Sequence, residues 1–139
     1  MAAISITAAN VIHASGPTEL GTAGEAFVSG AILYKSSAGT WLKAQNDGSA
    51  EQAGLYGIGM ALFTADVAAA KGQVATFGSI ITVNAALIAA GMYWLHGTAG
   101  SFTLTIADIA QTNYGTFIGI GRSTTSLLFC PVYSGAILA

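Results

Sequence analysis

The stretch that decides the fold is GAILYKSSAGTW at residues 30–41, because it returns as GMYWLHGTAGSF at residues 91–102. Every position pairs at an offset of 61 without a gap, so that Trp41 matches Phe102. Gly39 and Gly100 each end a short loop, where a residue with positive φ closes a hairpin. Apolar, β-branched and aromatic residues flank both loops. Each copy therefore predicts a β-hairpin.

The repeat continues beyond the hairpins. LYGIG at residues 55–59 matches FIGIG at residues 117–121, and a further pair of short apolar segments follows each copy. Glycines inside these segments mark bulges, bends or close backbone approaches. We interpret the pattern as an internal duplication with halves at about residues 25–84 and 85–139.

The local pattern is β throughout. Apolar residues alternate with threonine at residues 102–106, and the same alternation occurs at residues 4–7. These features predict an all-β fold, a compact antiparallel β-sandwich. A jelly-roll arrangement is preferred, because about eight to ten short strands suit it.

Residues 1–24 precede the first repeat and are interpreted as an N-terminal arm or edge strand, with a single β domain at 25–139. The arm carries Ile4, Ile6, Val11 and Ile12, which we predict to form an intermolecular interface by adding to a sheet edge, either of a sister subunit or of a partner protein. Deleting residues 2–12 would then leave the body folded and weaken binding. The alternative is a core strand of its own domain, in which case the truncated protein unfolds.

The composition is poor in charge. Charged residues make up 7% of the chain, against about 25% in typical domains. Alanine, glycine, serine and threonine account for 70 of the 139 residues. Such a surface costs little to desolvate, which suits a protein covered by copies of itself or by a partner.

The same composition excludes several partners. The four cations are scattered and the net charge is −2, which argues against nucleic acid. Residues 79–95 are apolar but only about 17 long, with Asn84 inside, so two strands explain them better than a membrane span. The N-terminus lacks the basic region of a signal peptide, so we expect a cytoplasmic product that leaves only inside a particle.

No catalytic, cofactor or metal site is predicted. The two Gly-x-Gly pairs do not complete a nucleotide-binding motif, and the two histidines and six acidic residues are isolated. A serine–histidine–aspartate set can be drawn from Ser101, His96 and Asp108, but no nucleophile elbow surrounds the serine. His13 has no metal-binding spacing, and Cys130 is interpreted as an inert strand residue.

Four segments resemble, in order, the tailed-phage capsid cement (decoration) proteins: AGEAFVSGAILYKSSAGTWLKA (23–44), GLYGIGMA (54–61), AAAKGQVATFGSI (68–80) and AAGMYWLHGTAGSFT (89–103). The resemblance spans about residues 23–122 and consists of turn glycines and apolar alternation. It implies a β-sandwich or jelly roll that forms a symmetric dimer or trimer. It also implies a structural virion protein on the outer capsid surface, whose partner is the major capsid protein and which stabilises contacts between capsomers. No catalytic residues are implied.

Two other functions stay open. A head-fibre or tail-fibre module would share the composition, although a fibre is expected to carry many short repeats. A small ligand-binding or carbohydrate-binding β-barrel could use Tyr34, Trp41, Tyr93 and Trp94, but their pairing across the repeats favours core or hairpin packing.

Overall fold

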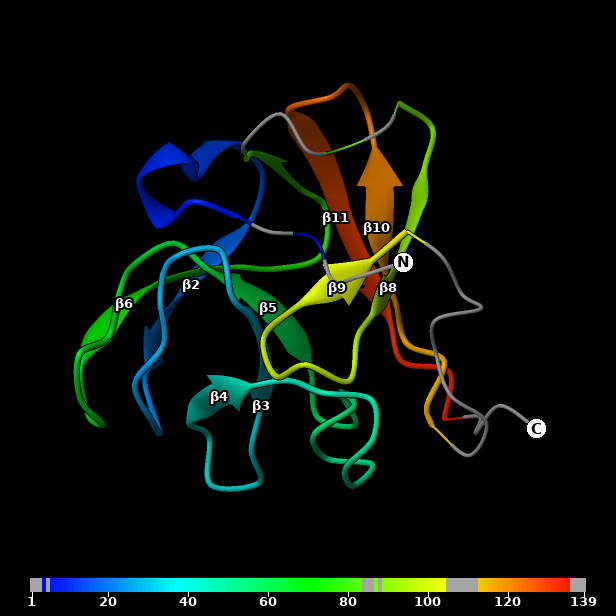
Figure 1. The fold of residues 1–139 in the computed structure, drawn as a ribbon. Coiled ribbons are helices and arrows are strands. Elements are labelled where there is room, and N and C mark those ends of the chain that lie inside the picture. Colours follow the sequence, from blue (N-terminus) through cyan, green and yellow to red (C-terminus); the bar gives the residue numbers. More distant parts are fainter. Residues whose placement is uncertain (1–3, 5, 84–86, 88, 105–112, 136–139) are drawn as a thin grey trace.

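The computed structural model describes residues 4, 6–83, 87, 89–104 and 113–135. The chain folds into two antiparallel β-sheets that pack face to face (Figure 1). A single 3-10 turn at Ala8–Asn10 is the only helix among the described residues. The structure thus confirms the predicted all-β fold with antiparallel sheets.

The two sheets have five and six strands. The five-stranded sheet contains, in spatial order, β2 (Thr18–Thr22), β6 (Lys71–Ala75), β5 (Ile58–Ala61), β3 (Ile32–Lys35) and β4 (Trp41–Lys43). The six-stranded sheet contains β1 (Ile12–Ser15), β7 (Ser79–Thr82), β11 (Ser126–Val132), β10 (Phe117–Gly121), β8 (Met92–Leu95) and β9 (Phe102–Thr103). In Figure 1 the labelled strands of the five-stranded sheet lie on the left, and β8, β10 and β11 of the six-stranded sheet lie to their right.

The strand order makes the duplication visible. The order β2-β6-β5-β3-β4 in one sheet matches β7-β11-β10-β8-β9 in the other, and β1 is an additional edge strand beside β7. In both halves a hairpin (β3–β4, β8–β9) is followed by a strand that pairs on its other side. By topology the halves meet in the turn at residues 76–78, so β2 belongs with the first half and β7 with the second.

The jelly-roll part of the expectation is not confirmed. Each sheet here is built by one continuous half of the chain, apart from β1. The two halves therefore stack as like units instead of exchanging strands between the layers.

The main core lies between the sheets. Its largest fully buried side chains from the six-stranded sheet are Ile81, Tyr93, Leu95, Phe102, Ile118, Leu127 and Phe129. The opposite sheet contributes Ile32, Tyr34, Ile58 and Met60. The rings of Tyr93 and Phe102 meet edge to face at 5.4 Å. This arrangement fills the space between the layers with hydrocarbon.

A second, smaller core covers the outer face of the five-stranded sheet. Leu33, Trp41 and Val74 point outward from this sheet and are buried by the connections at residues 23–31 and 62–70. The Trp41 ring lies directly over the sheet, where a Cβ on Gly21 would come within 2.6 Å of its Cδ1 atom. The first half thus buries both faces of its sheet.

The matched hairpins differ in register by one residue. In the first, Lys35 pairs with Trp41; in the second, Leu95 pairs with Phe102, so the second turn is one residue longer. Because side chains alternate along a strand, this shift moves the aromatic residue to the opposite face. Trp41 points outward and Phe102 points into the main core, although the sequence repeat pairs them.

One buried polar residue ties the halves together. The Asn46 side-chain amide donates to the backbone carbonyl of Leu95 at 2.8 Å. The backbone carbonyl of Asn46 accepts from the Tyr114 N–H at 2.9 Å. The Asn113 amide donates to Asn46 Oδ1 at 3.3 Å. Asn46 is almost fully buried, so each lost bond leaves a polar group away from water.

Asn46→Ala should therefore lower the free energy of unfolding by about 1–3 kcal/mol, measured by urea denaturation. Asn113→Ala is the matched control, because it removes only the longer of the two side-chain bonds and should have a smaller effect. Equal stability of Asn46→Ala and the parent would show that this residue does not link the halves.

Candidate functional site

The outward face of the six-stranded sheet is exposed, whereas the outward face of the five-stranded sheet is covered by the second core. Tyr93, Leu127 and Phe129 point into the main core, so the residues between them on the same strands point away from it. The register of the ladders places these outward side chains on one surface, which we call the open face: Ile12, Ile80, Thr82, Met92, Trp94, Phe117, Ile120, Ser126, Leu128, Cys130 and Val132.

The open face is apolar and exposed. Ile12 is 61% exposed, Val132 53%, Met92 51% and Ile120 36%, which is unusual for large apolar side chains on a sheet. Met92, Ile120, Leu128 and Ile80 occupy neighbouring strands in register and form one continuous row. Beside this row, the rings of Trp94 and Phe117 meet edge to face at 5.4 Å. None of the eleven residues of the open face carries a charge.

Comparison of the two repeats shows that the open face lacks the covering connections found in the first half. Leu33 and Ala31 are buried in the first half, whereas Trp94 and Met92, at the matching positions, are partly exposed. The connection between β5 and β6 spans residues 62–70 and packs over its sheet, but β10 and β11 are joined by the tight turn at residues 122–125. Among the described residues, no second cluster covers the open face.

The four residues predicted to form an interface separate into two groups. Ile4, Ile6 and Val11 are half-buried against the main core of their own chain, and the Ile4 N–H donates to the Phe102 carbonyl at 2.8 Å. Ile12 instead lies on the open face, at the start of β1, which pairs with β7. The structure therefore brings three of the four together inside the domain and places the fourth on the exposed surface.

The fit of the N-terminal segment depends on Gly30. This residue has φ +93°, and a Cβ there would lie 2.9 Å from the Cγ2 atoms of both Ile6 and Val11. Glycine is therefore required at this position both for its conformation and for the close approach of the segment.

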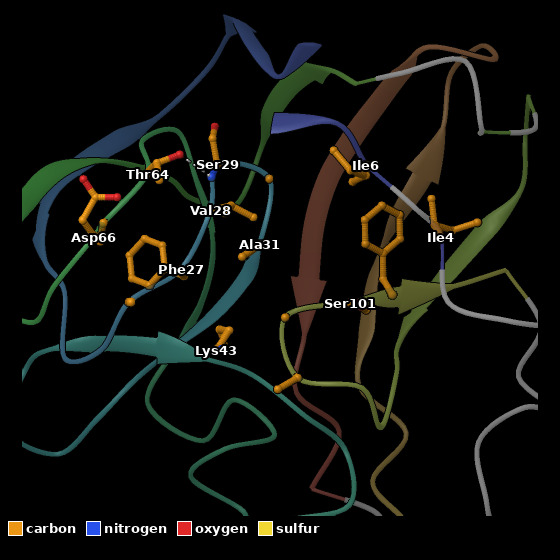
Figure 2. Close-up of a pocket in the computed structure, with 16 residues that line it drawn as sticks. Ile4, Ile6, Phe27, Val28, Ser29, Ala31, Lys43, Thr64, Asp66 and Ser101 are labelled. Atoms are coloured by element: carbon orange, nitrogen blue, oxygen red, sulfur yellow. Dashed lines mark hydrogen bonds between the residues drawn. The ribbon is translucent and has the colours of Figure 1, made fainter. Parts of the chain in front are cut away.

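A pocket of about 530 Å³ opens beside this segment (Figure 2). Ile4 and Ile6 lie on one side, and Phe27 and Val28, from the connection that covers the five-stranded sheet, lie on the other. Most of the lining is hydrocarbon; its charged residues are Lys43 and Asp66. The arrangement suits an apolar group, and it presents no convergent set of polar side chains that would activate a substrate.

Of the residues considered for catalysis, His96 and Ser101 lie side by side in the second hairpin, where the His96 N–H donates to the Ser101 backbone carbonyl at 3.1 Å. His96 Nδ1 accepts a hydrogen bond from the Thr98 N–H at 2.9 Å, which is a local turn contact. Asp108 lies outside the described residues. The described part of the chain contains no group of histidine, cysteine and carboxylate side chains able to hold a metal ion.

Two acidic groups have perturbed pKa values. Burial raises the pKa of the Cys130 thiol, so little reactive thiolate is present at neutral pH. Burial, followed by the nearby carboxylates of Glu51 and Glu25, raises the pKa of Tyr34, which keeps its hydroxyl protonated. Neither shift produces an activated nucleophile.

No family model matches the chain, and no curated protein matches it. No helix in the described residues is long and apolar enough to span a membrane.

Proposed function

We propose that this chain is a structural virion protein that docks on the outside of a tailed-phage capsid and stabilises contacts between capsomers. Its partners are the major capsid protein and further copies of itself. The sequence resemblance to capsid cement proteins supports this proposal, as does a charge content of 7%. No chemistry at a catalytic centre is part of the function.

The open face is the observation that carries the proposal. A soluble monomer rarely exposes a continuous apolar surface across several strands, because that surface favours association. The absence of charge means that no ion has to be desolvated when a protein covers it. Such a surface suits a protein that acts by binding other proteins.

The alternative of a carbohydrate-binding barrel receives less support. Sugar-binding aromatic rings must be accessible for stacking, but Trp41, Tyr34 and Tyr93 are buried in the two cores. Trp94 is partly exposed, and its neighbours on the open face are apolar or small. A fibre module is also less well supported, because the two repeats stack as the two layers of one sandwich instead of following one another along an axis.

Purified protein should co-sediment with expanded phage heads that lack their decoration protein, and the binding should saturate. Because only 7% of the residues are charged, few ion pairs can form across any contact with the capsid. Raising the salt concentration from about 0.1 M to about 1 M should therefore change the apparent affinity by no more than roughly twofold. Unexpanded heads and an unrelated β-sandwich protein are the controls. Failure to bind expanded heads, or binding that disappears in high salt, would contradict the proposal.

A further inference from the structure

We propose that the open face is the contact between two copies of this chain, which pack six-stranded sheet against six-stranded sheet about a two-fold axis. The inference rests on the part of the proposed function that has the protein associate with itself, and it names the surface involved. Capsid binding would then use other surfaces of the resulting dimer.

Charge is the first argument for a second copy. In a two-fold interface each residue faces the same surface patch, so any charged group near the axis meets its own like charge. The open face avoids this penalty altogether, because its eleven residues are all neutral. Elsewhere the protein places charges on its strands, as in the pair Lys35–Glu19 at 3.2 Å on β3 and β2.

Shape is the second argument. Sheets pack face to face when apolar side chains on adjacent strands interdigitate, and the open face presents such side chains. The row of Met92, Ile120, Leu128 and Ile80 crosses four adjacent strands. A second copy of the same sheet has the same twist and presents the same row, which lets the two rows interdigitate.

The available area predicts how strong the contact is. Five strands at about 4.8 Å and about 4–5 residues at about 3.3 Å give a face of roughly 24 by 15 Å. Two such faces bury on the order of 700–1,000 Å² in total, which is below the roughly 1,200–2,000 Å² of a stable specific interface and within the range of weak, transient contacts. The dimer should therefore be weak in solution and become firm where many copies are held on a lattice.

The first half of the chain supplies the third argument. It buries the matching face of its own sheet under residues 23–31 and 62–70, where Phe27 and Phe63 meet edge to face at 5.3 Å. In the first half, the outer face of the sheet is thus covered by aromatic and aliphatic side chains of the connecting segments. The open face of a second copy offers the same kinds of side chain.

Sedimentation velocity of the full chain at concentrations from about 1 to about 300 μM tests the proposal. The parent should pass from monomer to dimer, and Met92→Lys and Ile120→Lys should each weaken the dimer at least tenfold. Leu20→Lys is the matched control: Leu20 is a strand residue with 68% exposure on the other sheet, so this variant should dimerise like the parent. Circular dichroism establishes that each variant is folded; Met92 is half exposed, so its substitution leaves the core intact.

Cys130, at the open face, gives an independent readout. Its rate of modification by a maleimide should fall at least threefold as the parent concentration rises through the dimer range, and should stay constant in Met92→Lys.

A parent that remains monomeric at about 300 μM, or dimers unaffected by both open-face variants, would overturn the inference. If a monomeric parent still binds capsids and Met92→Lys abolishes that binding, the capsid protein occupies the open face: the dimer is then wrong and the proposed function stands. If dimers form as described but ignore capsids, the proposed function is wrong and the dimer stands.

Discussion

Phe129→Ala should lower the free energy of unfolding by about 3–5 kcal/mol, because it empties a fully buried site at the centre of the main core. Domains of this size have roughly 5–15 kcal/mol in total, so the loss is a large fraction of the stability. The thermal midpoint should fall by roughly 10–20 °C. Phe129→Leu, which keeps most of the volume, should cost clearly less and remain folded.

Leu128→Ala is the matched control, one position earlier on the same strand. Its side chain points to the open face and is only partly buried, so the dilute monomer should lose about 1 kcal/mol or less. Urea unfolding at low protein concentration measures both variants. Equal losses at the two positions would show that β11 does not have one buried and one open side.

Deleting residues 2–12 should lower the thermal midpoint by about 10 °C, which corresponds to about 3 kcal/mol. The deletion removes three half-buried apolar side chains, Ile4, Ile6 and Val11, together with the hydrogen bond from the Ile4 N–H to Phe102. Of the two outcomes that the sequence left open for this segment, the structure favours loss of stability in its own domain. Calorimetry at low concentration checks the result.

Two point variants separate packing from association. The double variant Ile4→Ser and Ile6→Ser should reproduce most of the loss, while Ile12→Ser should change the stability of the monomer by no more than about 0.5 kcal/mol. An unchanged midpoint after deletion, combined with lost oligomers, would instead mean that the segment acts between molecules.

Much of the fold could be predicted because its signals are local. Gly39 and Gly100, with φ +86° and +82°, close the two hairpins as the sequence indicated. Gly119 sits at a register shift in β10, and a Cβ there would strike the backbone oxygen of Leu128. Both features follow from what a glycine permits that other residues do not.

Two other features, the direction in which the hairpin aromatic residues point and the exposure of the open face, depend on contacts between distant segments. The matched positions Trp41 and Phe102 face opposite ways, because their hairpins close with turns of different length. Nothing in a run of alternating residues distinguishes a face that a distant connection will cover from one left bare, so the open face was missed. The one available signal was the length of the connections: residues 62–70 in one half against 122–125 in the other.

The matching strand orders of the two halves also have a consequence for the history of the molecule. The turn at residues 76–78 joins two equivalent modules. A shorter ancestral gene that encoded one module would build the same two-layer core by pairing two identical chains. Tandem fusion makes that pairing intramolecular and frees each module to diverge. The first module now has long connections that cover its outer surface, whereas the second has a short turn and an exposed outer surface. The two-layer fold thus has the architecture of a dimer of like modules joined in one chain, with one outer face covered and the other exposed.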